Sequence, residues 1–271
     1  MTSNFLDLNT HRIFYKIQGK GPRIVLVTGT NSDTRHTPTI YDVPGIEKFE
    51  VLNFDHRGMG QSTSPATDPT LSAYAEDIAK LLHHIGWEKS NIIGVSFGGM
   101  VAQHFAVSHP EMIDKLVLCC TSSGGKGGSS YPLHELMDLS AEEYAAFIMK
   151  KMNLKHTDAW QKSDPEKAKK AYEFYLKGAK GSHSTPEKLE AMKKQFAARA
   201  NHDLYEELGS LPIETFIACG EDDGVAPVAN SRALAARIPH GQLHIYKGGH
   251  LFLKEDAKAW PSILKFITGE S

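Results

Sequence analysis

Short runs of β-branched and other apolar residues alternate along this chain with segments of helical periodicity, and this alternation restricts the fold more than any other feature. Six runs are predicted to be strands: residues 22–29, 50–55, 90–96, 114–122, 213–220 and 241–248. Several of them are apolar throughout, as parallel strands are when helices cover both faces of their sheet. The sequence therefore predicts an α/β fold with a mostly parallel, twisted sheet and helices on both faces.

The N-terminal residues predict an antiparallel addition to this sheet. Residues 5–21 alternate apolar and polar side chains around a turn at Asn9-Thr10, which is typical of a hairpin at a sheet edge. Apolar residues at spacings of three and four, among them Leu71, Tyr74 and Ile78, predict a helix over 70–86 with one buried face. Three further stretches are predicted to be helical: 97–110, 226–238 and 255–269.

Residues 133–208 contain no strand pattern and predict three to four helices inserted between two strands of the core. Ser140 and Glu143 have the spacing of a capping box, and Pro165 and Pro186 each mark the start of a helix. The preceding stretch TSSGGKGGSSYP (121–132) lacks the phosphate-loop spacing and is interpreted as a flexible hinge. The predicted division is a core of residues 1–124 and 209–271, with residues 125–208 as a helical insertion.

Composition and charge narrow the function classes. A formal net charge of -2, with acids and bases interspersed, provides no basic surface for nucleic acid. The first residues do not resemble a signal peptide and no apolar run approaches about 18 residues, so we expect a cytoplasmic protein without membrane spans. The three cysteines have no C-x-x-C spacing and the 14 histidines no H-E-x-x-H pair. We therefore expect inert, buried thiols, and neither a metal nor a cofactor.

A serine at the junction of a predicted strand and a predicted helix carries the main functional signal. Ser96 lies in the sequence Gly94-Val95-Ser96-Phe97-Gly98. A strand that turns directly into a helix brings the residues two before and two after the turn together, and Gly94 and Gly98 remove the Cβ atoms that would collide. The turn strains the serine backbone by about 1–3 kcal/mol. It presents the Ser96 hydroxyl as a nucleophile and directs the Phe97 amide toward a developing oxyanion.

A serine nucleophile needs a base and an orienting carboxylate, and both follow the last two predicted strands. His250 comes directly after two glycines at the end of the strand 241–248. The loop after 213–220 carries Glu221, Asp222 and Asp223, and spacing alone leaves all three eligible. The chain order serine, acid, histidine is the one expected when the nucleophile lies on a strand-to-helix turn.

In these features the chain resembles the α/β-hydrolase-fold serine hydrolases over nearly its whole length. In that family a G-x-x-D-x-x-x-P loop carries the triad acid; Gly220, Asp223 and Pro227 match it, so the resemblance selects Asp223. The stretch FDHRGMGQS (54–62) is similar to the family's D-x-R-G-x-G-x-S turn, in which Asp55 and Arg57 are implied to be structural.

The resemblance also implies a second oxyanion donor and a cap. The family's donor follows the strand 22–29 in an H-G-x loop, whereas this chain has Val27-Thr28-Gly29-Thr30-Asn31, with threonine in the histidine position. A backbone amide does not depend on the side chain, so the Thr30 amide is the implied partner of the Phe97 amide. The helical insertion, rich in aromatic residues and methionine, occupies the position of the family's cap over the active site.

Together these features predict a serine hydrolase that cleaves a small or medium, partly apolar carboxylic ester or lactone. Ser96, His250 and Asp223 would act through an acyl-enzyme intermediate without a cofactor. A serine at the turn argues against the haloalkane dehalogenase and epoxide hydrolase branches, which use a carboxylate nucleophile. C–C bond hydrolases, perhydrolases and slow-turnover small-molecule receptors of the same fold share these residues and stay open as alternatives. The physiological substrate and the oligomeric state are also left open.

Overall fold

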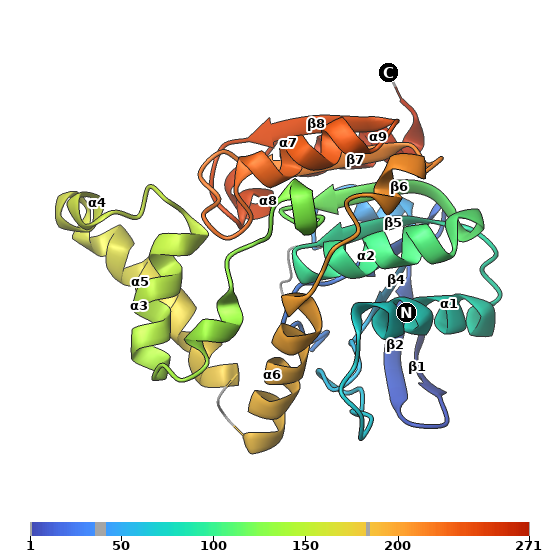
Figure 1. Ribbon diagram of the computed structural model, residues 1–271, viewed down its shortest axis with the longest axis horizontal. Helices are drawn as coiled ribbons and strands as arrows, with labels where there is room; N and C mark the ends of the chain where they lie inside the picture. The colour runs from blue at the N-terminus through green and yellow to red at the C-terminus, as the bar shows by residue number, and fades with distance from the viewer. Residues whose placement is uncertain (1, 36–41, 183–184, 271) are drawn as a thin grey trace.

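A computed structural model describes residues 2–35, 42–182 and 185–270, which form an eight-stranded sheet with helices on both faces (Figure 1). The strands lie in the order β1-β2-β4-β3-β5-β6-β7-β8. Their bounds are β1 Thr2–Asp7, β2 Arg12–Gln18, β3 Arg23–Val27, β4 Glu50–Phe54, β5 Ser90–Val95, β6 Ile113–Cys119, β7 Thr215–Gly220 and β8 Gly241–Tyr246. The predicted α/β fold is confirmed, and each predicted strand is present.

The first two strands form the predicted antiparallel hairpin. β1 and β2 pair with Phe5 opposite Phe14, and the Leu8 amide donates to the His11 carbonyl at 2.9 Å to close the turn. β2 also pairs antiparallel with β4, whereas every pair from β4 to β8 is parallel. The carboxyl ends of the parallel strands therefore meet at one edge of the sheet, where ligand sites of α/β folds form.

Helices cover each face because successive strand residues point to opposite sides. Val25 and Val27 pack with residues of α1 (Leu71–Ile85), α2 (Phe97–Ser108) and α7 (Val228–Arg237). Ile24 and Leu26 pack on the opposite face with α8 (Phe252–Glu255) and α9 (Ala259–Thr268). The predicted C-terminal helix 255–269 is present as α9 but begins four residues later, at Ala259, because the chain is extended at Asp256 and Pro261 fits only the first turn of a helix.

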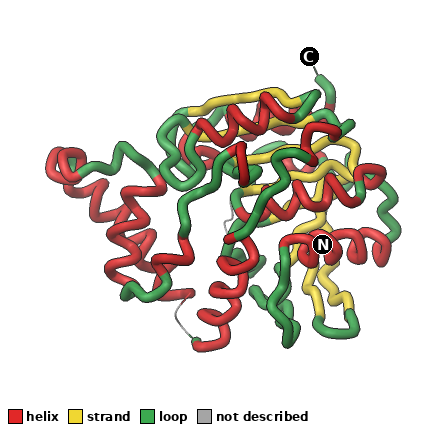
Figure 2. The backbone as a smooth tube through the Cα atoms, viewed as in Figure 1, coloured by secondary structure: helices red, strands yellow, loops and turns green. Residues whose placement is uncertain are grey.

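The residues between β6 and β7 are helical in every regular element that the structure describes. These elements are η3 Gly125–Gly127, η4 Leu133–Leu136, α3 Ala141–Met152, α4 Asp158–Ser163, α5 Pro165–Ser182, α6 Pro186–Ala200 and η5 Glu207–Ser210. Figure 2 shows α3 to α6 beside the sheet rather than within its layers. Residues 125–208 are called the helical segment below. Its helices share a separate apolar cluster that includes Leu136, Ile148 and Phe196, and the capping box of Ser140 and Glu143 is present.

The stretch 121–132, predicted from the sequence to be a flexible hinge, is closely packed where it leaves the core. Ser122 and Ser123 are buried, and the Ser123 carbonyl accepts a hydrogen bond from the Leu204 amide at 2.9 Å. A Cβ atom on Gly124 would lie 1.7 Å from the His202 carbonyl oxygen. The glycines therefore allow the backbone to pack closely, which composition alone does not distinguish from flexibility. Within the described ranges, no helix combines the length and apolar character needed to cross a membrane.

Candidate active site

Ser96 lies on a sharp turn between the end of β5 and the first residue of α2. Its backbone has φ 55° and ψ -115°, a sparsely populated conformation for a residue other than glycine. A Cβ atom on Gly94 would lie 2.7 Å from the Gly98 carbonyl oxygen, and one on Gly98 would lie 2.1 Å from the Val27 carbonyl oxygen. Both glycines are therefore required by close backbone approach, and the turn directs the Ser96 side chain out of the sheet edge.

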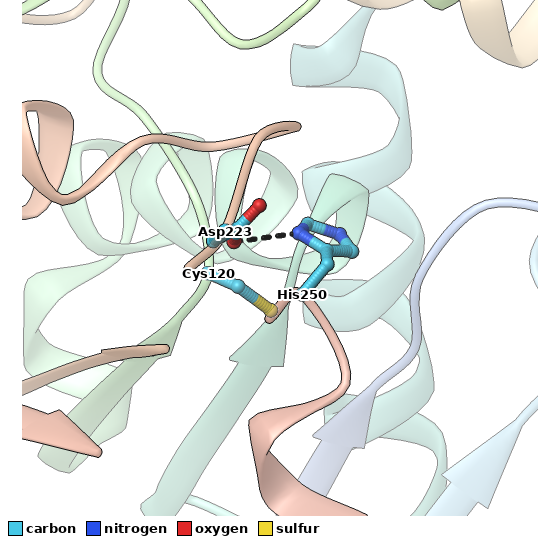
Figure 3. Close-up of side chains that lie close together, drawn as sticks. All are labelled: Cys120, Asp223 and His250. Carbon is cyan, nitrogen blue, oxygen red and sulfur yellow. Dashed lines mark hydrogen bonds and ion pairs between the residues drawn. The ribbon is translucent and has the colours of Figure 1, made fainter. Parts of the chain in front are cut away.

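His250 joins Ser96 to Asp223 in a chain of hydrogen bonds. His250 Nε2 lies 2.9 Å from Ser96 Oγ, and His250 Nδ1 lies 2.8 Å from Asp223 Oδ2. Figure 3 shows the Asp223 carboxylate facing the imidazole. Both residues are more than 90% buried. The helical segment also helps to position His250, because the His250 backbone amide donates to the Met152 carbonyl at 2.6 Å. Three side chains that follow three different strands are thus brought together.

The structure distinguishes between the three acids of the loop after β7. The amides of Val225 and Ala226 both donate to Asp223 Oδ1 at 2.8 Å, which leaves Oδ2 for His250. Glu221 and Asp222 instead form ion pairs with Lys155, at 2.9 and 2.6 Å. Only Asp223 of these three faces the imidazole.

The backbone amides of Thr30 and Phe97, both near Ser96, have no hydrogen-bond acceptor in the described part of the chain. The Phe97 amide is free because the first amides of a helix have no intrahelical partner. The loop that carries Thr30 is close to the turn, since a Cβ atom on Gly29 would lie 3.7 Å from Ser96 Cβ. These two amides are the candidates for the oxyanion donors that the sequence predicted.

Two side chains that the sequence did not single out hold this loop. His56 Nε2 donates to the Thr28 carbonyl at 3.0 Å, and burial lowers the pKa of His56 to about 4, so the imidazole is a neutral donor. Asn31 follows with φ 60°, and its amide donates to Gln195 Oε1 of α6 at 2.9 Å. Gln195 is fully buried. A polar residue in the buried position of a helix is the sequence signal that could have identified it.

Cys120 lies beside the acid and the base, which the sequence also did not predict (Figure 3). Ligand atoms of Cys120, Asp223 and His250 lie within 4.8 Å of one another. Burial, followed by the nearby charge of Asp223, raises the pKa of the Cys120 thiol well above its usual value, so the sulfur is a protonated thiol rather than a thiolate. Asp223 Oδ2 and His250 Nδ1 are hydrogen-bonded to each other, so this trio fits an acid–imidazole pair with a neutral neighbour better than a metal site.

A cavity of about 1020 Å³ lies between the sheet edge and the helical segment, with Ser96 and His250 in its wall. Most of the remaining lining from the helical segment is apolar, including Leu133, Ile148, Met152, Phe174, Met192 and Phe196. Asp33 and Arg35, which pair with each other through Arg35 Nη2 at 2.5 Å, line the same cavity from the core. The sheet edge that carries Ser96 and His250 therefore faces a mostly apolar pocket large enough for a medium-sized molecule.

The side chains of the turn 54–62 hold neighbouring parts of the scaffold. Asp55 is buried and accepts from the amides of Thr34 and Gln61 at 2.7 and 2.8 Å. Arg57 makes two hydrogen bonds of 2.7 Å to the buried carboxylate of Asp77 on α1. Neither Asp55 nor Arg57 contacts Ser96 or His250, in agreement with the structural roles implied by the sequence.

Comparison with known proteins identifies the family of this fold. The family model of the alpha/beta hydrolase fold matches residues 25–257. The chain belongs to the α/β hydrolase fold family. A poly(3-hydroxyalkanoate) depolymerase of Ectopseudomonas oleovorans is 32% identical to this α/β hydrolase over 225 residues, which cover 82% of the chain and 76% of the relative. A putative carbamate hydrolase of Caulobacter sp. strain K31 is 27% identical over 236 residues and 83% of each chain. The crystal structure of an enol-lactonase from Burkholderia xenovorans LB400 superposes with a TM-score of 0.78 at 21% identity, over 98% of this chain and 100% of that one.

Proposed function

We propose that this α/β hydrolase is a serine hydrolase that cleaves carboxylic esters or lactones with a medium-sized, partly apolar acyl or ring portion. The observation that carries the proposal is the hydrogen-bond chain from Ser96 Oγ through the His250 imidazole to Asp223, with the serine on a strained turn. A serine hydroxyl alone is a weak nucleophile. A base oriented by a buried carboxylate activates it by accepting its proton.

In the proposed acylation step, His250 Nε2 takes the Ser96 proton while Oγ attacks the carbonyl carbon of the ester. The amides of Thr30 and Phe97 donate to the carbonyl oxygen as it becomes an oxyanion, and Asp223 stabilises the positive imidazolium. The imidazolium then gives its proton to the leaving alcohol. Water, deprotonated by the same imidazole, releases the acid from the acyl-enzyme and restores Ser96.

We also propose that residues 125–208 act as a cap and residues 1–124 and 209–271 as the catalytic core. The apolar side chains of the helical segment that line the cavity support a substrate with an apolar portion. The name of the Ectopseudomonas oleovorans relative, a poly(3-hydroxyalkanoate) depolymerase, supports an ester of a hydroxy acid with an alkyl side chain as one form of this substrate. The enol-lactonase superposition rests on 21% identity and supports the fold alone.

The test is hydrolysis of p-nitrophenyl esters with acyl chains of 2 to 12 carbons and of lactones of different ring size, with the parent and with Ser96→Ala. We expect turnover to be highest for chains longer than acetate, and Ser96→Ala to lose about 10⁴-fold or more. A fluorophosphonate probe should label the parent but not Ser96→Ala. The control is Ser108→Ala, at the exposed end of the same helix. Equal turnover by Ser96→Ala and the parent would refute the proposal.

A further inference from the structure

The C-terminal end of α3 lies directly against the two loops that carry Asp223 and His250. The last four carbonyls of a helix have no intrahelical donor, and two of those in α3 accept from these loops instead. The Lys151 carbonyl accepts from the Gly224 amide at 3.0 Å, and the Met152 carbonyl accepts from the His250 amide at 2.6 Å. The helix therefore ends on the base itself and on the residue that follows the acid.

Both loops have a glycine where they meet the helix. A Cβ atom on Gly249 would lie 2.0 Å from the Met152 carbonyl oxygen, and one on Gly224 would lie 2.7 Å from the Lys151 carbonyl oxygen. Neither glycine has a positive φ, so close backbone approach rather than a left-handed conformation requires it. Contact with α3 therefore leaves no room for a side chain next to either the acid or the base.

Asn153 and Glu255 connect the same helix end to the base loop a second time. Asn153 Nδ2 donates to Glu255 Oε2 at 3.1 Å, and the Gly249 amide donates to the same oxygen at 2.7 Å. Asn153 Oδ1 accepts from the Lys155 amide at 3.0 Å, which determines the side of the Asn153 amide group that faces Glu255. One carboxylate oxygen thus joins the residue after α3 to the residue before His250.

Neither of these two side chains lies in the wall of the large cavity. Asn153 is more than 90% buried and Glu255 is exposed, and neither lines the cavity. Ile148 and Met152 of α3, by contrast, form part of the cavity wall. The helix therefore lines the cavity along one face and holds the base loop at its end. An effect of Asn153 or Glu255 on turnover would act through the position of His250.

We propose that Asn153 and Glu255 are positioning residues for His250. They hold the backbone from which the imidazole reaches Ser96 Oγ at 2.9 Å and Asp223 Oδ2 at 2.8 Å. Proton transfer depends on this placement, since a displacement of about 1 Å can reduce the rate about a hundredfold. The inference rests on the proposed function, because it concerns the base of the same reaction.

Replacement of Asn153 by aspartate tests the proposal with an isosteric change. The Lys155 amide keeps its acceptor, whereas the atom that donated to Glu255 becomes an oxygen that can only accept at pH 8. Two carboxylates then face each other, and the connection to the Gly249 amide is disturbed. We expect kcat for the best p-nitrophenyl ester to fall about tenfold or more. The value of KM should change less than about threefold, because neither residue lines the cavity.

Two changes at Glu255 separate the hydrogen bonds from the charge. Glu255→Gln removes the charge but keeps an oxygen that accepts from Asn153 and the Gly249 amide, so kcat should fall less than about threefold. Glu255→Leu removes the acceptor and should reproduce the loss of about tenfold or more. A role in fold stability alone would lower the melting temperature of Glu255→Leu and leave kcat per active site unchanged.

The matched control is Asn91→Asp, the same substitution at another buried asparagine. Asn91 is more than 90% buried, and its Nδ2 donates to the Arg23 carbonyl at 3.0 Å. It lies near the start of β5, whereas Ser96 follows the end of that strand. We expect Asn91→Asp to lower the melting temperature and to keep kcat per active site. Active sites are counted by titration with a fluorophosphonate, so unfolded protein does not lower the measured kcat.

The titration also distinguishes failure of this inference from failure of the proposed function. A parent that is not labelled at Ser96 would refute the proposed function, and the inference with it. A labelled parent whose kcat is matched by Glu255→Leu would overturn the inference alone, and the exposed position of Glu255 keeps this test available if Asn153→Asp does not fold. An equal loss of kcat in Asn91→Asp would also overturn it, because the effect would then reflect stability.

Discussion

Replacement of Asp223 by asparagine tests the proposed mechanism more sharply than removal of the nucleophile, because the change is isosteric. Oδ1 of Asp223 accepts from the amides of Val225 and Ala226, at 2.8 Å each. In Asp223→Asn those two donors require the amide oxygen to remain at the Oδ1 position. The new NH₂ group is then forced to face His250 Nδ1, which lies 2.8 Å from Oδ2 in the parent.

An NH₂ group at that position reverses the tautomer of His250. Nδ1 must accept, so the ring proton moves to Nε2, which can no longer accept the Ser96 proton across the 2.9 Å hydrogen bond. We expect kcat to fall by about 10⁴, as for a comparable change in a serine protease triad. That loss corresponds to about 5.5 kcal/mol of activation free energy.

The assay is steady-state hydrolysis of the best p-nitrophenyl ester by the parent, Asp223→Asn and Asp222→Asn, with the melting temperature of each variant. Asp222 neighbours Asp223 and pairs with Lys155, so Asp222→Asn controls for the loss of a charge in the same loop. We expect Asp222→Asn to keep kcat within about threefold of the parent, since an ion pair with an exposed lysine contributes little. A folded Asp223→Asn variant that keeps a tenth of the parent kcat would refute the reasoning.

Three further predictions follow from other contacts. Gln195→Met removes the acceptor of the Asn31 amide and should lower kcat about tenfold, roughly 1.4 kcal/mol. Its control is Lys194→Met, which removes the ion pair between the same helix and Asp68. An unchanged kcat in Gln195→Met would contradict the expected role of the hydrogen bond to Asn31. Gly98→Ala places a Cβ atom 2.1 Å from the Val27 carbonyl oxygen and should reduce the free energy of unfolding by about 3 kcal/mol or more, measured by urea denaturation; a change below about 0.5 kcal/mol would argue against the close approach. The pKa of His56 in the folded protein, about 4, lies below the usual 6.5. The contribution of neutral His56 to the free energy of unfolding is therefore full above pH 6.5 and is lost as the pH falls toward 4. Urea denaturation should show about 2 kcal/mol less stability from this group at pH 5 than at pH 7, a difference that would be absent if His56 were exposed.

The sheet, its hairpin and the meeting of Ser96 with His250 were predictable from the sequence because they depend on local pattern. Short apolar runs that alternate with helical segments predict a parallel sheet. Residues that follow the carboxyl ends of parallel strands lie at the same edge of that sheet. The choice among Glu221, Asp222 and Asp223 was not available from local spacing. In the structure it depends on two backbone amides and on Lys155, which lies in the distant helical segment.

Contacts between distant segments account for what the sequence did not predict. Gln195 and the Asn31 amide are 164 positions apart, and no periodicity relates them. Cys120 reaches the acid and base because the backbone bends at the end of β6, with φ 41° at that residue. Gly124 was interpreted as part of a flexible hinge. Glycine content alone does not distinguish a flexible backbone from one that packs too closely for a side chain, and the nearby His202 carbonyl shows that Gly124 is needed for close packing.

The position of the helical segment has a consequence for how such a protein can diversify. The chain leaves the sheet after β6 and returns to it at β7, and these two strands are hydrogen-bonded neighbours, with Leu116 beside Thr215. The excursion of more than ninety residues therefore begins and ends on neighbouring strands, and the sheet register does not depend on its length. A different excursion inserted at the same junction would leave the turn at Ser96 unchanged and, in the cap role proposed for residues 125–208, would change the substrate preference.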